Sequence, residues 1–215
     1  MKKNVKIISG ITAVAALSIG AITIAGTANS KEWKLPTELE AGVATASANP
    51  TTGAEIKIDK HDNVQKKPGE KAGLIDEVTN KSYFTIEVSN PKLLDQCPAR
   101  VGDIKLKPTR SKFLVLDVKA SMAKDIPQKV DSGSEEVFMP LIAEAFSVAS
   151  PDGKIDRNVA SEMSWGCFDD SVLLPAVLNP GQSVKGKVVL DVATTRGTVA
   201  FDPENNGGWS WPFGS

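Results

Sequence analysis

The stretch that decides the fold is residues 178–213, which read LNPGQSVKGKVVLDVATTRGTVAFDPENNGGWSWPF. Three runs in it alternate apolar with polar residues, and residues typical of tight turns precede each run: Asn179-Pro180-Gly181, Arg196-Gly197 and Asn206-Gly207-Gly208. Alternation with a period of two is typical of half-buried strands, and short turns between such strands join antiparallel neighbours. This part of the chain therefore predicts an antiparallel β-sheet.

The same pattern begins about 100 residues earlier. Phe84, Ile86 and Val88 alternate with polar residues, and Asn90-Pro91 is predicted to end that strand. The other predicted strands cover residues 113–122, 141–149 and 155–160, with a turn at Ser150-Pro-Asp-Gly153 between the last two. We count about seven strands and no convincing amphipathic helix, which indicates an all-β fold. A β-sandwich is the expected architecture, and a closed barrel is the alternative.

The N-terminus has the pattern of an export signal. The sequence MKKNVK is basic, residues 7–26 carry no charge, and Gly26-Thr27-Ala28 places small residues where a signal peptidase cleaves. A secretory signal peptide over residues 1–28 fits this pattern. An uncleaved anchor helix is the alternative, because residues 7–26 are long enough to span a bilayer. In that case the membrane would be contacted through residues 7–26.

Residues 29–80 are predicted to form a disordered, flexible linker, because large apolar side chains are sparse and small, polar and charged residues dominate. The predicted folded domain is then residues 81–215. The whole chain of 215 residues has a formal net charge of −1. Without residues 1–28 it has 22 basic against 26 acidic residues, a net charge of −4. Such a chain has no electrostatic reason to bind nucleic acid.

Cys97 and Cys167 are the two cysteines of the chain. In an exported protein two cysteines usually form a disulfide. Two buried free thiols are the alternative. A metal site is disfavoured because His61, the single histidine, lies in the predicted linker. We expect a disulfide between Cys97 and Cys167.

Three segments together resemble a known family: FLVLDVK at residues 113–119, FSVASPDG at 146–153 and LNPGQSVKGKVVLDV at 178–192. In order and spacing they are similar to the DUF4352-like secreted proteins, a group related in fold to the mycobacterial MPT63-type antigens. The segments GTVAFDP at 197–203 and GWSW at 208–211 resemble its actinobacterial branch. The resemblance implies an immunoglobulin-like β-sandwich on an exported protein of Gram-positive bacteria. It implies no catalytic residues, and the lipid-bearing cysteine of many relatives is missing.

The catalytic motifs that we sought are missing. No GxSxG, HExxH, Walker A or GxGxxG sequence occurs, and one histidine in a linker makes a Ser-His-Asp triad improbable. The acidic run at residues 152–158 lacks the glycine and glutamate offsets of a calcium loop. The adjacent acids Glu135-Glu136 and Asp169-Asp170 are interpreted as solvated loop residues. We therefore expect no catalytic residues, no metal and no cofactor.

Two surfaces are candidates for interaction. One is the polar loop from Asp125 to Glu136. The other is the last strand, where Trp209, Trp211 and Phe213 share one face, although filling the core is the favoured role for these rings. Trp165 is expected to pack against the sulfur of the nearby disulfide. The function expected from the sequence is that of an exported, non-enzymatic module that contacts an unidentified protein or ligand at the cell envelope or outside the cell. A hydrolase or metal-dependent enzyme using acidic loop residues, and a purely structural envelope protein, are the alternatives.

Overall fold

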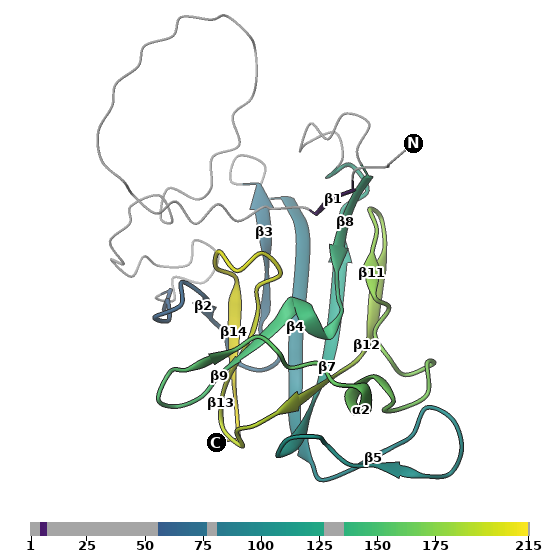
Figure 1. Cartoon of the computed structure of the whole chain (residues 1–215). Helices are drawn as coiled ribbons and strands as arrows, with labels where there is room; N and C mark the ends of the chain where they lie inside the picture. Colours follow the sequence, from purple (N-terminus) through teal and green to yellow (C-terminus); the bar gives the residue numbers. More distant parts are fainter. Residues whose placement is uncertain (1–4, 8–55, 77–80, 127–135, 215) are drawn as a thin grey trace, which may run out of the picture.

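The computed structural model describes residues 5–7, 56–76, 81–126 and 136–214. Its strands form two main sheets (Figure 1). The four-stranded sheet has the order β12-β7-β4-β3, with bounds Ser183–Val192, Lys112–Met122, Lys81–Leu94 and Lys71–Asp76. The five-stranded sheet has the order β10-β9-β13-β14-β2, with bounds Ile155–Asp156, Phe146–Ala149, Gly197–Phe201, Trp209–Phe213 and Val64–Gln65. The predicted all-β sandwich is confirmed.

Smaller elements complete the described part of the chain. β5 (Cys97–Pro98) and β6 (Lys105–Leu106) form a hairpin, and β8 (Glu136–Pro140) pairs with β11 (Val177–Leu178) and with β1 (Val5–Ile7). A 3-10 turn, η1 (Ala143–Ala145), precedes β9, and one turn of helix, α2, covers Glu162–Trp165. The predicted signal or anchor helix lies outside the described residues apart from the three residues of β1.

The main core fills the space between the two sheets. Alternate residues of β7, including Leu114, Leu116 and Val118, are buried there together with residues of β4 and β12. From the opposite sheet, the ring of Phe201 stacks on Phe84 with centroids 5.9 Å apart, and Trp209 lies 6.1 Å from Phe84. The period-two pattern of the sequence is thus the pattern of a sheet with its core on one side.

β7 is also buried on its other face. Phe113, Val115 and Val189 form a second, smaller core with Cys97 and Cys167 on the outer side of the four-stranded sheet. The β5–β6 hairpin and the α2 segment cover this side of the sheet (Figure 1). An end of the sandwich therefore has an additional layer, and the disulfide lies inside it.

The linker prediction is wrong for residues 56–76. β2 and β3 belong to the sandwich, since β3 pairs with β4 over Lys71–Asp76 and β2 pairs with β14. Ala72 is buried and Leu74 packs against the core. This segment has too few apolar residues to signal a strand alone, and its order comes from pairing with strands distant in the sequence. Residues 29–55 lie outside the described residues.

Three further differences concern element boundaries. β4 does not end at Asn90-Pro91 but continues to Leu94 through a register shift between Ser89 and Lys92. Asn90 has a left-handed φ of 55°, and the irregularity accommodates a proline that has no N–H for the ladder. The strand predicted at 141–149 is instead η1 followed by β9, and the strand predicted at 155–160 is reduced to β10.

Candidate functional site at the disulfide end

The disulfide joins the β5–β6 hairpin to the segment after α2. Cys97 and Cys167 have Cα atoms 5.6 Å apart and both side chains are buried. Backbone hydrogen bonds support the same junction, because Arg100 N donates to Gly166 O at 2.7 Å and Phe168 N donates to Pro98 O at 2.8 Å. The predicted pairing of the two cysteines is confirmed, and the bridge holds two loops against the sheet.

Phe168 has an unusual backbone conformation at this junction. Its φ is 62°, in the left-handed region that a bulky side chain rarely occupies. The disulfide at Cys167 and the hydrogen bond to Pro98 hold it there, while its ring packs against the second core. Backbone strain of this kind is found often at binding and catalytic sites, so it marks this end of the molecule for attention.

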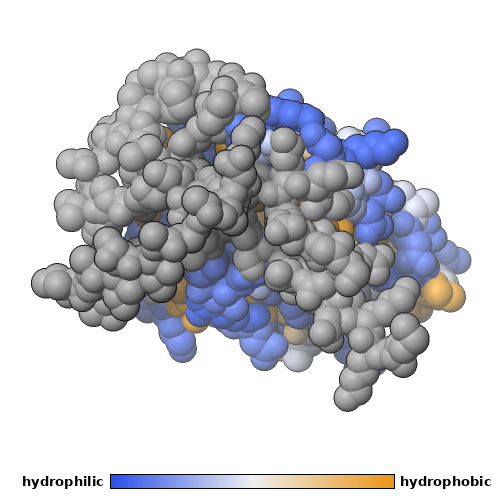
Figure 2. Space-filling model, turned by 90° about the horizontal axis from the view of Figure 1, so that it is seen from above, coloured by the Kyte–Doolittle hydropathy of each residue, from blue (hydrophilic) through white to orange (hydrophobic). Residues whose placement is uncertain are grey.

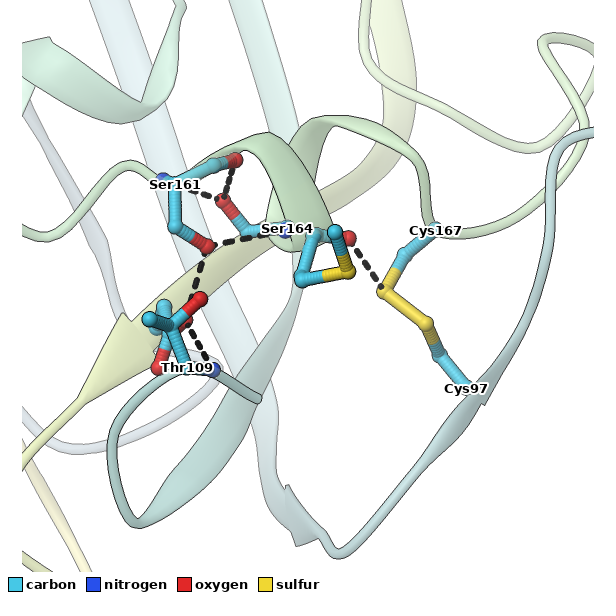
Figure 3. Close-up of a disulfide and its surroundings, with 7 residues drawn as sticks. Cys97, Thr109, Ser161, Ser164 and Cys167 are labelled. Atoms are coloured by element: carbon cyan, nitrogen blue, oxygen red, sulfur yellow. Dashed lines mark hydrogen bonds between the residues drawn. A yellow bond between two sulfur atoms is a disulfide. The ribbon is translucent and has the colours of Figure 1, made fainter. Parts of the chain in front are cut away.

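A buried carboxylate fixes the position of α2. Asp191 of β12 has no exposed surface and accepts hydrogen bonds from Thr109 N (2.8 Å), Arg110 N (3.1 Å) and the Ser161 hydroxyl (2.7 Å). Ser161 is the N-cap of α2 and its hydroxyl accepts a bond from Ser164 N, in a capping box with Ser164 (Figure 3). Asp191 therefore ties the loop before β7 and the first turn of α2 to the sheet.

A cavity of about 340 Å³ lies between α2, β12 and the segment before β11. Most of its wall is apolar, with side chains that include Leu141, Ile142, Leu173, Leu174, Val188 and Val189. The polar residues of the wall are Arg100, Ser164, Asp170 and Lys187, and Trp165 also lines it. A mostly apolar cavity with a few polar groups is the usual form of a small-molecule site.

Trp165 is 46% exposed, which is unusual for an indole. The expectation that it packs with the disulfide is wrong. The partners of the two sulfurs in the second core are Phe113, Val115 and Val189, and Met163 O lies 3.3 Å from Cys167 Sγ. Trp165 is the last residue of α2, and it lines the cavity.

Other apolar side chains are exposed on the segments that build this end. They are Val101 and Ile104 in the β5–β6 hairpin and Val172 and Val177 in the segment around β11. Figure 2 shows the molecule from above, relative to the view of Figure 1. By contrast, the described residues on this side are mainly hydrophilic, and the hydrophobic ones form small separate spots. The exposed apolar side chains are thus concentrated in the segments around the cavity.

The two basic residues of the cavity wall, Arg100 and Lys187, each form an ion pair with a neighbouring aspartate. Arg100 Nη1 lies 3.3 Å from Asp170 Oδ1, whereas the buried Arg100 Nε has no hydrogen-bond partner. Lys187 Nζ lies 2.5 Å from Asp117 Oδ1. Partial burial raises the pKa of Asp117, but hydrogen bonds from Lys187 and Asn90 and the positive charges of Lys187 and Lys92 outweigh it, so the pKa is lowered overall.

The two interaction surfaces expected from the sequence do not form this site. Trp209 is 7% exposed and Trp211 is fully buried, so their face of β14 belongs to the core and the structure offers no tryptophan platform there. Residues 127–135 of the candidate loop lie outside the described residues. At its described edge, Asp125 forms an ion pair with Lys81 at 2.6 Å and Ile126 is buried.

The alternative of an enzyme with paired acidic residues gains no support from the cavity, whose lining contains one carboxylate, that of Asp170. Among the described residues, no three side chains of His, Cys, Asp or Glu gather as metal ligands would. In the same part of the chain, no helix is long and apolar enough to cross a membrane.

The fold is similar to the crystal structure of MPT63, a secreted protein from Mycobacterium tuberculosis, with 15% sequence identity and a TM-score of 0.43. The alignment covers 70% of this chain and 97% of that chain. No family model and no curated protein matches the sequence, so the resemblance to DUF4352-like proteins stays a prediction. The strand order and register of the two main sheets define the fold.

Proposed function

We propose that this protein is a non-enzymatic binding module that acts outside the cytoplasm and takes a ligand into the cavity at the disulfide end. The observation that carries the proposal is the exposed indole of Trp165 beside a mostly apolar cavity of about 340 Å³. Keeping such a ring in water has a free-energy cost, and a ligand that covers it would remove that cost.

Two observations support action outside the cytoplasm. Residues 1–28 have the pattern of an export signal, and disulfides form and persist mainly in oxidising compartments. Whether the protein is released or stays anchored depends on cleavage after Ala28. Intact-mass measurement of the protein from culture medium and from membranes tests this. A chain beginning at Asn29 in the medium is the expected result, and full-length chain confined to the cytoplasm would contradict export.

The binding role is tested by a fragment screen with the purified, oxidised full chain. Neutral, anionic and cationic fragments are added, and ¹H–¹⁵N NMR spectra show which amides and which indole N–H shift. We expect the strongest shifts at the Trp165 indole and at the backbone amides of residues 173, 174, 176 and 187–189, which line the cavity.

The variant Trp165→Ala provides the check, with Ile75→Ala as its matched control. Both side chains are about half exposed, but Ile75 lies on the edge strand β3 and does not line the cavity. We expect about tenfold weaker fragment binding for Trp165→Ala, since a stacking aromatic contributes about 1 kcal/mol or more, and no change for Ile75→Ala. Equal loss in both variants, or fragments that bind only elsewhere, would refute a binding role for the cavity.

A further inference from the structure

We infer that the cavity takes a small apolar carboxylic acid, whose carboxylate binds Arg100 in the place now held by Asp170. This inference rests on the proposed function and adds the chemical class of the ligand. It concerns a low-molecular-weight acid rather than a macromolecule, because a volume of about 340 Å³ is at the small end of the range of about 300–1,000 Å³ for small-molecule sites.

The wall of the cavity favours an apolar body. Leu173, Leu174 and Val189 contribute aliphatic residues to it, and Trp165 supplies a flat aromatic surface. A saturated chain or an aromatic ring would bury its own apolar surface and theirs, which favours binding. A sugar or another polyhydroxylated ligand would lose hydrogen bonds to water against this wall.

Arg100 favours a carboxylate at one end of the ligand. Its guanidinium has one ion pair, from Nη1 to a single oxygen of Asp170. A carboxylate in the place of Asp170 could bond Nη1 and Nη2 together, in the bidentate geometry that arginine prefers. The backbone of Arg100 is already fixed by its bond to Gly166.

Asp170 has the properties of a displaceable occupant. Its side chain is 78% exposed, so its attraction to Arg100 is screened by water and is worth little. It lies in a turn closed by bonds from Val172 N to Asp169 O and from Leu173 N to Asp170 O. An incoming carboxylate can therefore replace it through rotation of one side chain, with no strand to be broken.

The net charge of the wall selects against other ligands. Arg100 and Lys187 are both cationic, and Asp170 is the one carboxylate in the wall. Once Asp170 turns away, the positive charge of Arg100 faces the ligand, whereas the ammonium of Lys187 is paired with Asp117. An amine in the same place would be repelled, and an amide would leave the guanidinium without its preferred partner.

The experiment uses matched pairs of probes on the oxidised full chain. Octanoate and 3-phenylpropanoate are each compared with their own carboxamide, which keeps the shape and removes the charge. Titration followed by the Trp165 indole signal in NMR gives the dissociation constants. We expect each acid to bind about tenfold tighter than its amide, as a charge-assisted bidentate pair predicts.

Two variants of the Arg100–Asp170 ion pair must then change the affinity for the acids in opposite directions. Arg100→Gln should weaken acid binding about tenfold and leave the amides unchanged, whereas Asp170→Asn should tighten acid binding several-fold because it removes the competing carboxylate. Thermal unfolding of both variants checks that the fold is kept. If the ion pair served only to hold the loop, both variants would weaken binding alike, and that result would overturn the inference.

The remaining outcomes separate the inference from the proposed function. If acids and amides bind in the cavity with equal affinity, or if amines bind more tightly, the ligand class is wrong but the binding site stands. If none of the acids or amides shifts the cavity signals while other fragments do, the carboxylate inference fails in the same way. If no fragment of any charge shifts them, the proposed function fails as well.

Discussion

At the scale of single residues, the most consequential side chain is a buried carboxylate. The carboxylate of Asp191 is satisfied by two backbone N–H groups and one hydroxyl. Through Ser161 it sets the start of α2 and hence the place of Trp165 at the cavity. A buried carboxylate thus positions a side chain that lines the cavity.

Asp191→Ala is expected to lower the free energy of unfolding by about 3 kcal/mol, because three buried donors lose their acceptor. Ser161→Ala should cost about 1 kcal/mol, since it removes one of those bonds and the helix cap. Urea denaturation monitored by tryptophan fluorescence measures both. Equal losses in the two variants would show that Asp191 is not the organising acceptor.

At the scale of elements, the segment 172–174 lies against β12 as an added edge. Lys187 N donates to Val172 O at 2.8 Å and Leu174 N donates to Lys187 O at 2.9 Å. The approach is close because Gly186 has no side chain: a Cβ there would lie 2.5 Å from backbone atoms of Leu173 and Leu174. The same segment forms part of the cavity wall.

Gly186→Ala should therefore push this segment away from β12. We expect a loss of about 2 kcal/mol of unfolding free energy from the overpacked contact, with faster hydrogen exchange at the amides of Leu174 and Lys187. Ser183→Ala, at an exposed position of the same strand, is the control and should change neither quantity. Unchanged exchange in Gly186→Ala would contradict the close packing described here.

Comparison of elements shows what the sequence could predict. β7, β12, β13 and β14 were predictable because each alternates strongly and its buried face lies on the main core. β3 was not, because its order depends on pairing with β4 rather than on its own apolar residues. α2 is one turn long, too short for a helical period, so its cap at Ser161 was its sole local signal.

The cavity was still less predictable, because its parts meet only in the folded chain. Arg100, Trp165 and Lys187 come from three segments, and none of them belongs to a motif. The one local hint was a tryptophan in the mainly polar run SEMSWGCFDD at residues 161–170, which has no alternation to bury it. The tryptophans at 209 and 211 alternate regularly, and they are the ones in the core.

At the scale of the whole molecule, the disulfide joins two regions separated by 70 residues in the sequence. The enclosed chain includes β7, β9, the hairpin β5–β6 and α2, so strands of both sheets lie within one covalent loop. The bridge therefore restricts the unfolded chain as a whole and not just the site.

The double variant Cys97→Ser, Cys167→Ser should lose about 4 kcal/mol of unfolding free energy, the chain-entropy value for a loop of this length. Because both sulfurs are buried, the native protein should also resist dithiothreitol until it unfolds. Urea denaturation of the oxidised protein and of the variant measures the first effect. A difference below about 1 kcal/mol would indicate a strained bridge or a compact unfolded chain.

Acidification should destabilise the folded protein. The pKa of Asp117 is lowered, and the hydroxyls of Ser150 and Ser171 hold the pKa values of Asp152 and Asp169 below the ordinary value of 3.8. Carboxyls with depressed pKa values contribute stability that is present above 3.8 and is lost as the pH falls through their folded-state values. Urea denaturation from about pH 6 to about pH 2 should show this loss.

Asp117→Asn isolates the contribution of one carboxyl to this acid effect. The variant cannot ionise at position 117, so its difference in unfolding free energy from the parent should be largest at neutral pH and shrink toward about pH 2. A difference that stays constant with pH would mean that the ion pair with Lys187 contributes nothing through its charge.

The parallel pairing of β2 with β14 has a mechanical consequence. Under tension applied between residues 56 and 214, these strands are pulled in opposite directions along their length, so the bonds from Val64 N to Gly208 O and from Lys66 N to Ser210 O are loaded together in shear. Once they rupture, the disulfide keeps 70 residues from extending, about 240 Å of contour length. Oxidised molecules therefore stretch less far than reduced ones under the same force.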